Sequence, residues 1–178
     1  NEILRSHQEV EIANFLYLNN IEYEYEPIYQ YNIQYSHKPY TPDFVIYQNG
    51  KIAYIEHFGI TENGKNDRYS QDELEQYKKA INDKIKLHKQ HDTTLIYTFS
   101  VYNDGKPLTE HLQEALEVKG FELKPRSNKE VMELLVAGEE NRYVRKLINL
   151  ICRFISNFKV NGYNAEEFNR MYHSTQNV

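Results

Sequence analysis

Asp43 and Glu56 are the residues of this sequence whose chemistry and spacing best fit a metal site. They stand at matching ends of two β-rich runs that Asn49-Gly50 separates. Asn-Gly is the strongest short signal for a β-hairpin, because both central residues of a type I′ turn need a positive φ. Across a two-residue loop at positions 49 and 50, the numbers of facing residues sum to 99, so Asp43 faces Glu56. Facing side chains lie on the same side of the sheet, with Cβ atoms roughly 5 Å apart.

Two carboxylates in this position repel each other, and partial burial increases the cost. A bound cation, a shared proton or a basic neighbour would relieve the repulsion. Magnesium is typically held by one or two carboxylates together with waters and substrate phosphate. The alternative is that both acids are solvated at the frayed end of the hairpin, and a one-residue slip in register would separate them.

Two capping boxes predict helices on either side of this hairpin. The Ser-x-x-Glu pattern at 6–9 begins a first helix that ends at 19–20, and the same pattern at 70–73 opens a long helix to about His91. Helical spacing gives the second helix an inward stripe that consists of Leu74, Tyr77, Ile81, Lys84 and His88.

The strands are predicted from alternation and from turn residues. Residues 22–31 alternate aromatic and polar side chains, which predicts a strand interrupted at Pro27, and base stacking on the tyrosines is the alternative use of these rings. Residues 94–100 are expected to form a strand and 108–118 a helix that Gly120 stops. This order predicts an α/β fold with a mixed β-sheet flanked by helices. Both faces of the hairpin are apolar, so its strands should be central and covered on both sides.

Residues 125–178 are predicted to form a helical appendage to an α/β domain at residues 1–124. A helix start recurs at 127–130, and an amphipathic helix follows that ends at 161–162. The apolar stretch of this helix contains Cys152, the single cysteine, which is expected to be buried.

The composition excludes several classes of protein. A formal net charge of −5 argues against nucleic-acid binding through a general positive field, but it is compatible with a local basic groove. No apolar run approaches the ~18 residues needed to span a bilayer, and no signal peptide opens the chain. One cysteine cannot form a disulfide within the monomer and favours a reducing compartment, so we expect the cytoplasm. The chain starts without methionine, which indicates a fragment of a larger protein.

The same residues resemble a known family. Pro42-Asp43-Phe44, a short hairpin and Ile55-Glu56-His57-Phe58 resemble the PD-(D/E)XK restriction-endonuclease-like superfamily. A longer set of matches over about residues 3–120 resembles the nuclease-like insertion of UvrD/Rep-type superfamily 1 helicases of the helicase IV kind: Ser6-x-x-Glu9-x-x-Ile12-Ala13-Asn14-Phe15-Leu16, Glu24-Tyr25-Glu26, Tyr54 to Ile60, Tyr77, Lys84, His88 and Thr94-Leu95-Ile96. The resemblance implies a restriction-endonuclease-like fold, DNA as substrate, Mg²⁺ or Mn²⁺ bound by Asp43 and Glu56, and a helicase body as partner.

In this superfamily a lysine two positions after the glutamate assists the attacking water, and this sequence lacks that lysine. That position holds Phe58, and His57 points away from Glu56 because side chains alternate along a strand. Lys84 could supply the cation from the following helix, where it would orient water or offset transition-state charge. The alternative is a lysine that extends from a partly buried stem into solvent.

Four other residues are candidates for supporting roles. In related nucleases a first-helix glutamate often completes the metal site, and Glu9 is placed to do so, although it could instead cap its own helix. Tyr77, Lys78 and His88 are candidates for nucleic-acid contacts, and the lysine run around Lys78 could equally be a solvated helix face. His88 and His91 alone are too few ligands for zinc.

The leading hypothesis is a metal-dependent deoxyribonuclease domain that serves a DNA helicase. Asp43, Glu56 and the main-chain carbonyl of His57 would hold the ion. Lys84 would position the attacking water, and Glu9 would bind the ion or a metal-bound water. A second hypothesis is an inactive module that uses the same fold to bind DNA or a protein partner beside the motor, and a third is assembly through the helical appendage. The sequence has no GxxxxGK[ST] loop, so this segment is not the ATPase itself.

Overall fold

The computed structural model describes residue 4 and residues 6–33, 38–137, 142–164, 166–167 and 169–170. The chain divides into two compact units, Asn1–Arg126 and Ser127–Val178. The boundary predicted after residue 124 lies two residues before this division.

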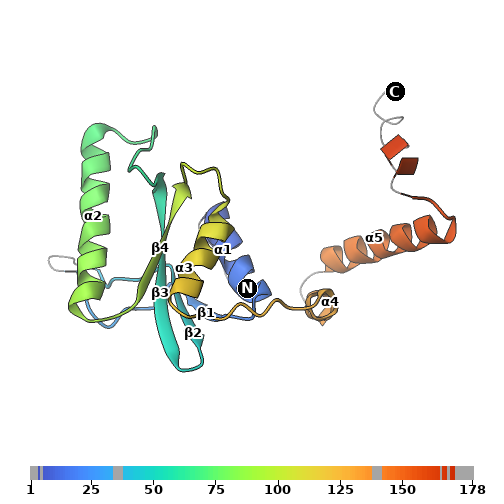
Figure 1. Cartoon of the computed structure of the whole chain (residues 1–178), viewed down its shortest axis with the longest axis horizontal. Coiled ribbons are helices and arrows are strands. Elements are labelled where there is room, and N and C mark those ends of the chain that lie inside the picture. Colours follow the sequence, from blue (N-terminus) through green and yellow to red (C-terminus); the bar gives the residue numbers. More distant parts are fainter. Residues whose placement is uncertain are drawn as a thin grey trace. The chain divides into compact units, whose positions relative to one another are not determined.

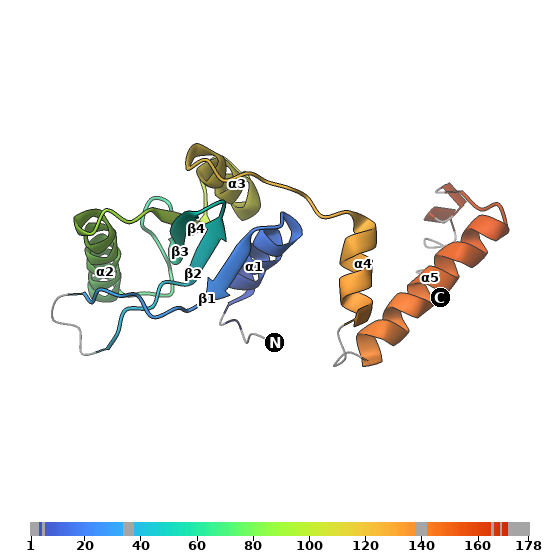
Figure 2. The same cartoon turned by 90° about the horizontal axis from the view of Figure 1, so that it is seen from below.

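The first unit is built on a four-stranded sheet in the order β1-β2-β3-β4. The strands β1, β2 and β3 pair antiparallel, whereas β4 pairs parallel to β3, so the sheet is mixed as predicted. The parallel pair is joined by the crossover helix α2. In the views of Figure 1 and Figure 2, α2 covers one face of the sheet, and α1 and α3 cover the other. The bounds are α1 His7–Leu18, β1 Glu22–Tyr25, β2 Phe44–Gln48, β3 Lys51–Thr61, α2 Gln71–Gln90, β4 Leu95–Val101 and α3 Leu108–Val118.

The hairpin between β2 and β3 has the register that Asn49-Gly50 predicts. Asn49 has φ 50 and Gly50 has φ 78, so both turn residues take the left-handed conformation that a type I′ turn requires. Five Cα pairs follow, from Gln48 opposite Lys51 to Phe44 opposite Ile55, and each pair sums to 99. The register prediction is therefore confirmed along the whole β2–β3 ladder.

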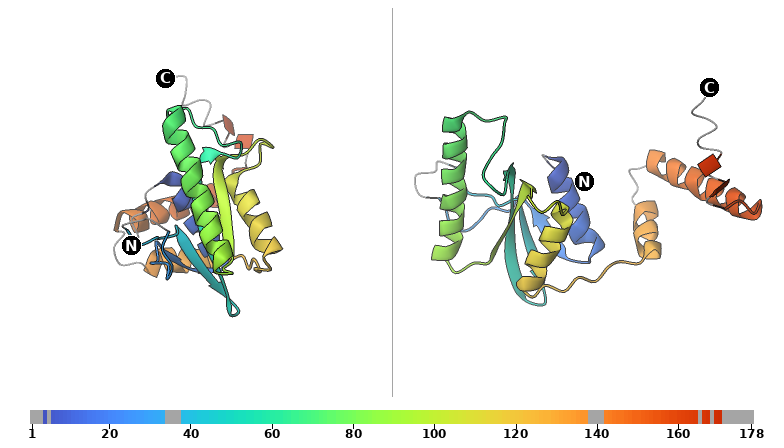
Figure 3. Two further views of the ribbon diagram at one scale, coloured as in Figure 1. Left: turned by 90° about the vertical axis from the view of Figure 1, so that its left-hand side faces the viewer. Right: turned by 45° about the horizontal axis from the view of Figure 1, so that its top comes forward.

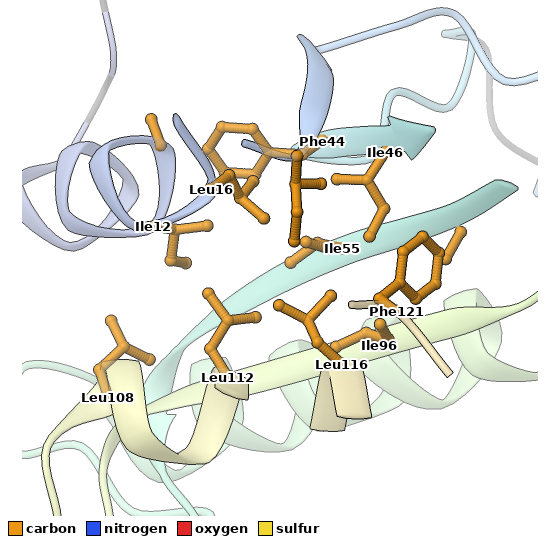
Figure 4. Close-up of a cluster of buried hydrophobic side chains, with 13 residues drawn as sticks. Ile12, Leu16, Phe44, Ile46, Ile55, Ile96, Leu108, Leu112, Leu116 and Phe121 are labelled. Carbon is orange, nitrogen blue, oxygen red and sulfur yellow. The ribbon is translucent and has the colours of Figure 1, made fainter. Parts of the chain in front are cut away.

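The main hydrophobic core lies between the sheet and the pair α1 and α3 (Figure 4). Alternate residues of β2 and β3 point into it, since side chains two apart share a face of a strand. The helices contribute apolar residues at helical spacing. The labelled members of this core are Ile12, Leu16, Phe44, Ile46, Ile55, Ile96, Leu108, Leu112, Leu116 and Phe121.

We expect Leu112→Ala to destabilise the protein by about 2–5 kcal/mol, because Leu112 is fully buried and its removal leaves a cavity under the sheet. Urea denaturation of the purified chain measures this loss as a lower midpoint with an unchanged slope. Val118→Ala on the same helix is the control, since Val118 is 83% exposed. Equal midpoints for the two variants would show that Leu112 is not packed in the core.

The prediction that both faces of the hairpin are covered is wrong near the turn. Val45 is buried on the α2 side, but Tyr47 is 38% and Ile52 is 53% exposed on that same side. The reason is that α2 packs over the part of β3 near Tyr54 and Glu56, and the hairpin extends past the end of this helix (Figure 3).

The strand predicted at 22–31 is also shorter than expected. It ends at Tyr25, because Glu26 has a φ of 48, outside the strand region, and Pro27 follows without an N–H to donate. Tyr29 and Tyr40 are buried together with Leu87 in a smaller cluster on the α2 side of the sheet. These two rings are therefore packed inside the unit and are not free to stack on bases.

The helix caps agree with the sequence patterns. Ser6 accepts a hydrogen bond from the Glu9 N–H at the start of α1, and Ser70 with Glu73 forms a complete capping box at the start of α2. Gly120 has a φ of 75 just after α3, which fits the predicted stop.

The second unit contains α4, Asn128–Ala137, and α5, Arg142–Val160. Its first helix is capped by Ser127 and Glu130 as the sequence predicts. The expectation that Cys152 is buried is wrong, because this side chain is exposed. Apolar neighbours on α5 are exposed as well, among them Leu150 at 65% and Phe154 at 53%, since this small unit has too little of its own surface to cover them.

No helix in the described parts of the chain is both long enough and apolar enough to cross a membrane.

Candidate functional site

Glu56 and Lys84 form a salt bridge at the centre of the α2-covered face. Glu56 is 1% exposed on β3, and its Oε2 lies 2.6 Å from Nζ of Lys84. The inward stripe of α2 directs the lysine to this point, and the ammonium keeps 27% of its side chain exposed. The lysine that contacts Glu56 thus comes from α2, and position 58 on β3 holds a buried phenylalanine.

The second oxygen of Glu56 accepts a hydrogen bond from Tyr40, at 2.6 Å. Burial, with the nearby carboxylate of Glu56, raises the pKa of the Tyr40 hydroxyl far above its ordinary value, so it acts as a donor. Because this proton goes to Glu56, His88 must donate from Nε2 to the Tyr40 oxygen across 3.1 Å. Nδ1 of His88 then accepts from the Thr93 hydroxyl at 2.8 Å. Burial and the charge of Lys84 lower the pKa of His88 to about 4, so its ring is neutral at pH 7.

Asp43 completes the carboxylate pair from the residue just before β2. Its Oδ2 accepts a hydrogen bond from the main-chain N–H of His57, at 2.6 Å. Burial, and then the charge of Glu56, raise the pKa of Asp43 to about 7, while the His57 hydrogen bond and Lys84 act in the opposite direction. Burial and the neighbouring carboxylate therefore outweigh the effect of Lys84 and of the His57 hydrogen bond on the pKa of Asp43.

His57 lies with its ring on the opposite face from Glu56, as strand alternation predicts. Nδ1 lies 2.9 Å from Thr98 Oγ1, and Nε2 lies 3.1 Å from Gln8 Oε1. Burial lowers the pKa of this ring. The imidazole therefore links β3 to β4 and α1, and the atom that contacts Asp43 is its main-chain nitrogen.

Glu9 is held by Tyr25, whose hydroxyl donates to Oε2 at 2.7 Å. Its negative charge raises the pKa of Asp43, so it acts on the carboxylate pair through space. Its own main-chain N–H caps the helix through Ser6. The structure thus places Glu9 on α1, in the wall of a groove next to the site.

This groove has a volume of about 960 Å³ and lies between the start of α1, the ends of β3 and β4, and the loop before α2. Its lining residues include Glu9, His57, Gly59, Tyr77, Lys65, Arg68, Tyr69 and Ser100. Tyr77 accepts a hydrogen bond from the Gly59 N–H at 3.1 Å, and burial raises the pKa of its hydroxyl, with smaller contributions from Tyr69, Asp43 and Glu56. The groove therefore lies next to the site at the end of β3, and Asp43, Glu56 and Lys84 are outside its lining.

The three residues expected to contact nucleic acid have different surroundings. Tyr77 lines the groove. Lys78 pairs with Glu75 at 3.3 Å, and its stem lies against Gly64, where a Cβ would come within 2.9 Å of it. His88 is 1% exposed, so in this structure it supports the site from inside and presents no surface to a strand. Sequence reasoning missed Tyr40, because this residue precedes β2 in an irregular segment without periodicity.

Tyr40→Phe is expected to destabilise the protein by about 1–3 kcal/mol, because it leaves an oxygen of Glu56 and Nε2 of His88 without their shared partner. Thermal and urea denaturation measure this change. Tyr47→Phe is the matched control, since Tyr47 is 38% exposed, and it should change stability by less than about 0.5 kcal/mol. A stability loss no larger than that of the control would show that the Tyr40 hydroxyl is not hydrogen-bonded to Glu56 and His88.

The donor set fits a hard divalent cation that keeps several waters. No three His, Cys, Asp or Glu side chains within the described residues gather closely enough to form a full protein cage. Mg²⁺ needs only one or two carboxylates. Asp43 and Glu56 are two such carboxylates, and burial together with the charge of Glu56 raises the pKa of Asp43.

Comparisons of this chain with models of protein families, with curated proteins and with solved structures each found no match. The geometry of the site and the resemblance of its residues are therefore the grounds for a functional assignment.

Proposed function

We propose that the first unit is a Mg²⁺- or Mn²⁺-dependent nuclease domain that hydrolyses DNA phosphodiesters. The observation that carries this proposal is the meeting of Asp43, Glu56 and Lys84 on one face of the sheet, from the residue before β2, from β3 and from α2. It is costly for a fold to bring two acids and a cation together, largely withdrawn from solvent, without a ligand.

The charges of this cluster favour a divalent ion. Asp43 and Glu56 carry two negative charges when ionised, and Lys84 returns one positive charge. These three groups sum to −1, so a divalent cation would compensate the negative charge that Lys84 leaves.

Each residue then has a role that its contacts support. Asp43 and Glu56 would hold the ion, which polarises the phosphate and lowers the pKa of the attacking water when bound. Lys84 would stabilise negative charge that develops on the phosphate, in place of the lysine absent at position 58. Tyr40 and the His57 N–H fix the two carboxylates in orientation. Glu9 would accept a hydrogen bond from a water in the groove.

The resemblance to the insertion of UvrD/Rep-type helicases supports DNA as substrate and a helicase body as partner. Under this proposal the nuclease domain acts in the cytoplasm as an accessory to the motor. The opposing candidate, an inactive module that binds DNA or a protein beside the motor, is favoured by one observation. Lys84 is already bound to Glu56, so in this arrangement its ammonium is turned towards the protein.

The test is to incubate the protein with single-stranded, duplex and forked DNA in the presence of Mn²⁺. We expect the unchanged chain to cleave DNA, and Asp43→Ala and Glu56→Ala to abolish this cleavage. Glu75→Ala, a substitution at an exposed acid of α2, should leave the cleavage intact. Cleavage that survives both site substitutions unchanged would refute the assignment. Salt-sensitive DNA binding without cleavage and without thermal stabilisation by Mn²⁺ would support the inactive module.

A further inference from the structure

We propose that the groove beside the carboxylate pair binds single-stranded DNA, with Tyr69 as a stacking platform for a base and Arg68 and Lys65 as phosphate contacts. This inference rests on the proposed function, because it assumes that the site acts on DNA. It goes beyond that proposal in naming a single strand as the preferred form of the DNA. It also names binding residues that no sequence pattern indicated. The groove is the one between α1, the ends of β3 and β4, and residues 61–70.

The loop that carries these residues is ordered by its own hydrogen bonds. The Thr61 N–H donates to the Lys65 carbonyl at 2.9 Å, and the Lys65 N–H donates to Thr61 Oγ1 at 3.0 Å. Asn66 donates to the Gly59 carbonyl from its side chain and accepts from the Arg68 N–H at 2.9 Å. Because the loop is tied to β3 at Gly59, its backbone is ordered before a ligand arrives, which lowers the entropic cost of binding.

Lys65 and Arg68 are the cations of the groove lining, and both side chains are exposed. Neither forms an ion pair with any residue that the structure describes, so both can bind phosphate oxygens. The lining also contains the acids Glu9 and Asp67, so its formal charge is balanced. Binding here would therefore depend on two local phosphate contacts and on stacking, and not on a broad positive field.

Tyr69 supplies the stacking surface. Its ring is stacked on that of Tyr77, with centroids 5.6 Å apart and planes inclined by 21°. Tyr77 is fixed in turn by the hydrogen bond from the Gly59 N–H, and Tyr69 is 39% exposed. A supported, partly exposed ring of this kind can stack on an unpaired base of any identity. In a duplex the base faces are covered by their neighbours, so this platform favours a single strand.

The groove places this platform next to the proposed reactive groups. Tyr77, under the platform, contacts the Gly59 N–H, three residues after Glu56 on β3. Glu9 and His57 line the same groove, while Asp43, Glu56 and Lys84 are outside its lining. A strand whose base stacks on Tyr69 would therefore be held beside the carboxylate pair, at the end of β3.

The experiment measures binding separately from hydrolysis. Fluorescence anisotropy of the full chain with a labelled oligothymidylate, in EDTA, should give tighter binding than for a duplex of the same length. We expect Tyr69→Ala to weaken single-strand binding about tenfold. Arg68→Ala should weaken it several-fold and reduce the slope of log K against log salt by about 0.7, the value for one phosphate contact on a single strand.

The controls are Tyr47→Ala and Lys79→Ala. Tyr47 is 38% exposed, almost the same fraction as Tyr69, but it lies near the hairpin turn, and Lys79 is a lysine of α2 outside the groove. Both should bind the oligonucleotide like the unchanged chain. The melting temperature of each variant confirms that it is folded.

Duplex binding as tight as single-strand binding, or a folded Tyr69→Ala variant with unchanged affinity, would overturn the inference. Single-strand binding that depends on Tyr69 in a protein that never cleaves DNA would support the inference and refute the nuclease proposal. Cleavage of duplex by a protein that does not bind the oligonucleotide would leave the nuclease proposal intact and refute the single-strand groove.

Discussion

Asp43→Asn is expected to raise the stability of the metal-free protein at pH 8 and to abolish its stabilisation by Mn²⁺. The pKa of Asp43 is about 7 in the folded protein against an ordinary value of 3.8, so the folded state binds this proton more tightly than the unfolded state. The resulting stabilisation is complete below pH 3.8 and is lost as the pH rises through 7. Above pH 7 the charged aspartate costs the fold on the order of 4 kcal/mol, since each pH unit corresponds to about 1.4 kcal/mol.

Asparagine removes this cost because it is neutral at every pH and can still accept the hydrogen bond from the His57 N–H. In EDTA, the melting temperature of Asp43→Asn should therefore exceed that of the unchanged chain at pH 8. The difference should shrink as the pH falls towards 4, where Asp43 is itself protonated. Differential scanning fluorimetry between pH 4 and pH 8 measures the melting temperatures of both proteins. Asp72→Asn, at an exposed acid near the start of α2, is the control and should show no such pH dependence.

Asp43→Asn should also remove a carboxylate that the proposed metal ion needs. At a concentration 100 times its Kd, a bound ion stabilises the folded chain by about 2.7 kcal/mol, and Asp43→Asn should lose this gain. In the unchanged chain the gain should decline as the pH falls below 7, because protons then compete with the ion for Asp43. A variant that is less stable than the unchanged chain at pH 8 in EDTA would show that the carboxylate pair is not under repulsion. Retained stabilisation by Mn²⁺ would place the ion elsewhere.

The sequence was sufficient for features that depend on local physics. Asn49-Gly50 determines its own turn, because few other residue pairs tolerate two successive positive φ values, and the hairpin register follows from it. Ser70 and Glu73 satisfy each other's main-chain groups and so begin α2 without help from the rest of the fold. The mixed sheet flanked by helices then follows from the order of these elements.

The contact between Lys84 and Glu56 could be predicted from the sequence only in part. Helical spacing indicated that Lys84 points inward, and strand register indicated which face of β3 carries Glu56. Neither pattern determines how far α2 is displaced along the sheet, so the sequence allowed the 2.6 Å contact without requiring it. The structure supplies that displacement, and with it a candidate replacement for the lysine absent at position 58.

Irregular segments account for what the sequence left out. Tyr40 reaches Glu56 from a segment without helical or strand periodicity, and Tyr69 gains its role only through stacking on Tyr77. The early end of β1 depends on a left-handed Glu26, a conformation that a glutamate rarely adopts and that no composition rule indicates. Cys152 was expected inside because its neighbours are apolar, but a small unit cannot cover both faces of a long helix.

Lys84→Met is expected to reduce DNA cleavage by about 10²- to 10³-fold, the effect typical of removing one donor that stabilises developing charge. Methionine keeps an apolar stem of similar length, so the packing of α2 is largely preserved. Removal of the ammonium also takes away the positive charge that pairs with Glu56 and lowers the pKa of Asp43. Because Lys84 lowers the pKa of Asp43, its loss should raise that pKa above 7 and shift the onset of Mn²⁺ stabilisation to higher pH.

Two companion variants separate this role from a general effect of charge. Lys86→Met removes an exposed lysine two residues along the same helix and should leave both cleavage and the pH dependence unchanged. Lys84→Arg keeps the positive charge and should restore the pH dependence in full but cleavage only in part, because a planar guanidinium does not reproduce the point contact of the ammonium. Weak cleavage by Lys84→Met with normal Mn²⁺ binding would show that Lys84 acts in the cleavage step and not in binding the ion. Unchanged cleavage and an unchanged pH dependence would mean that Lys84 only extends past the site into solvent, and the inactive binding module would then be the better account of this fold.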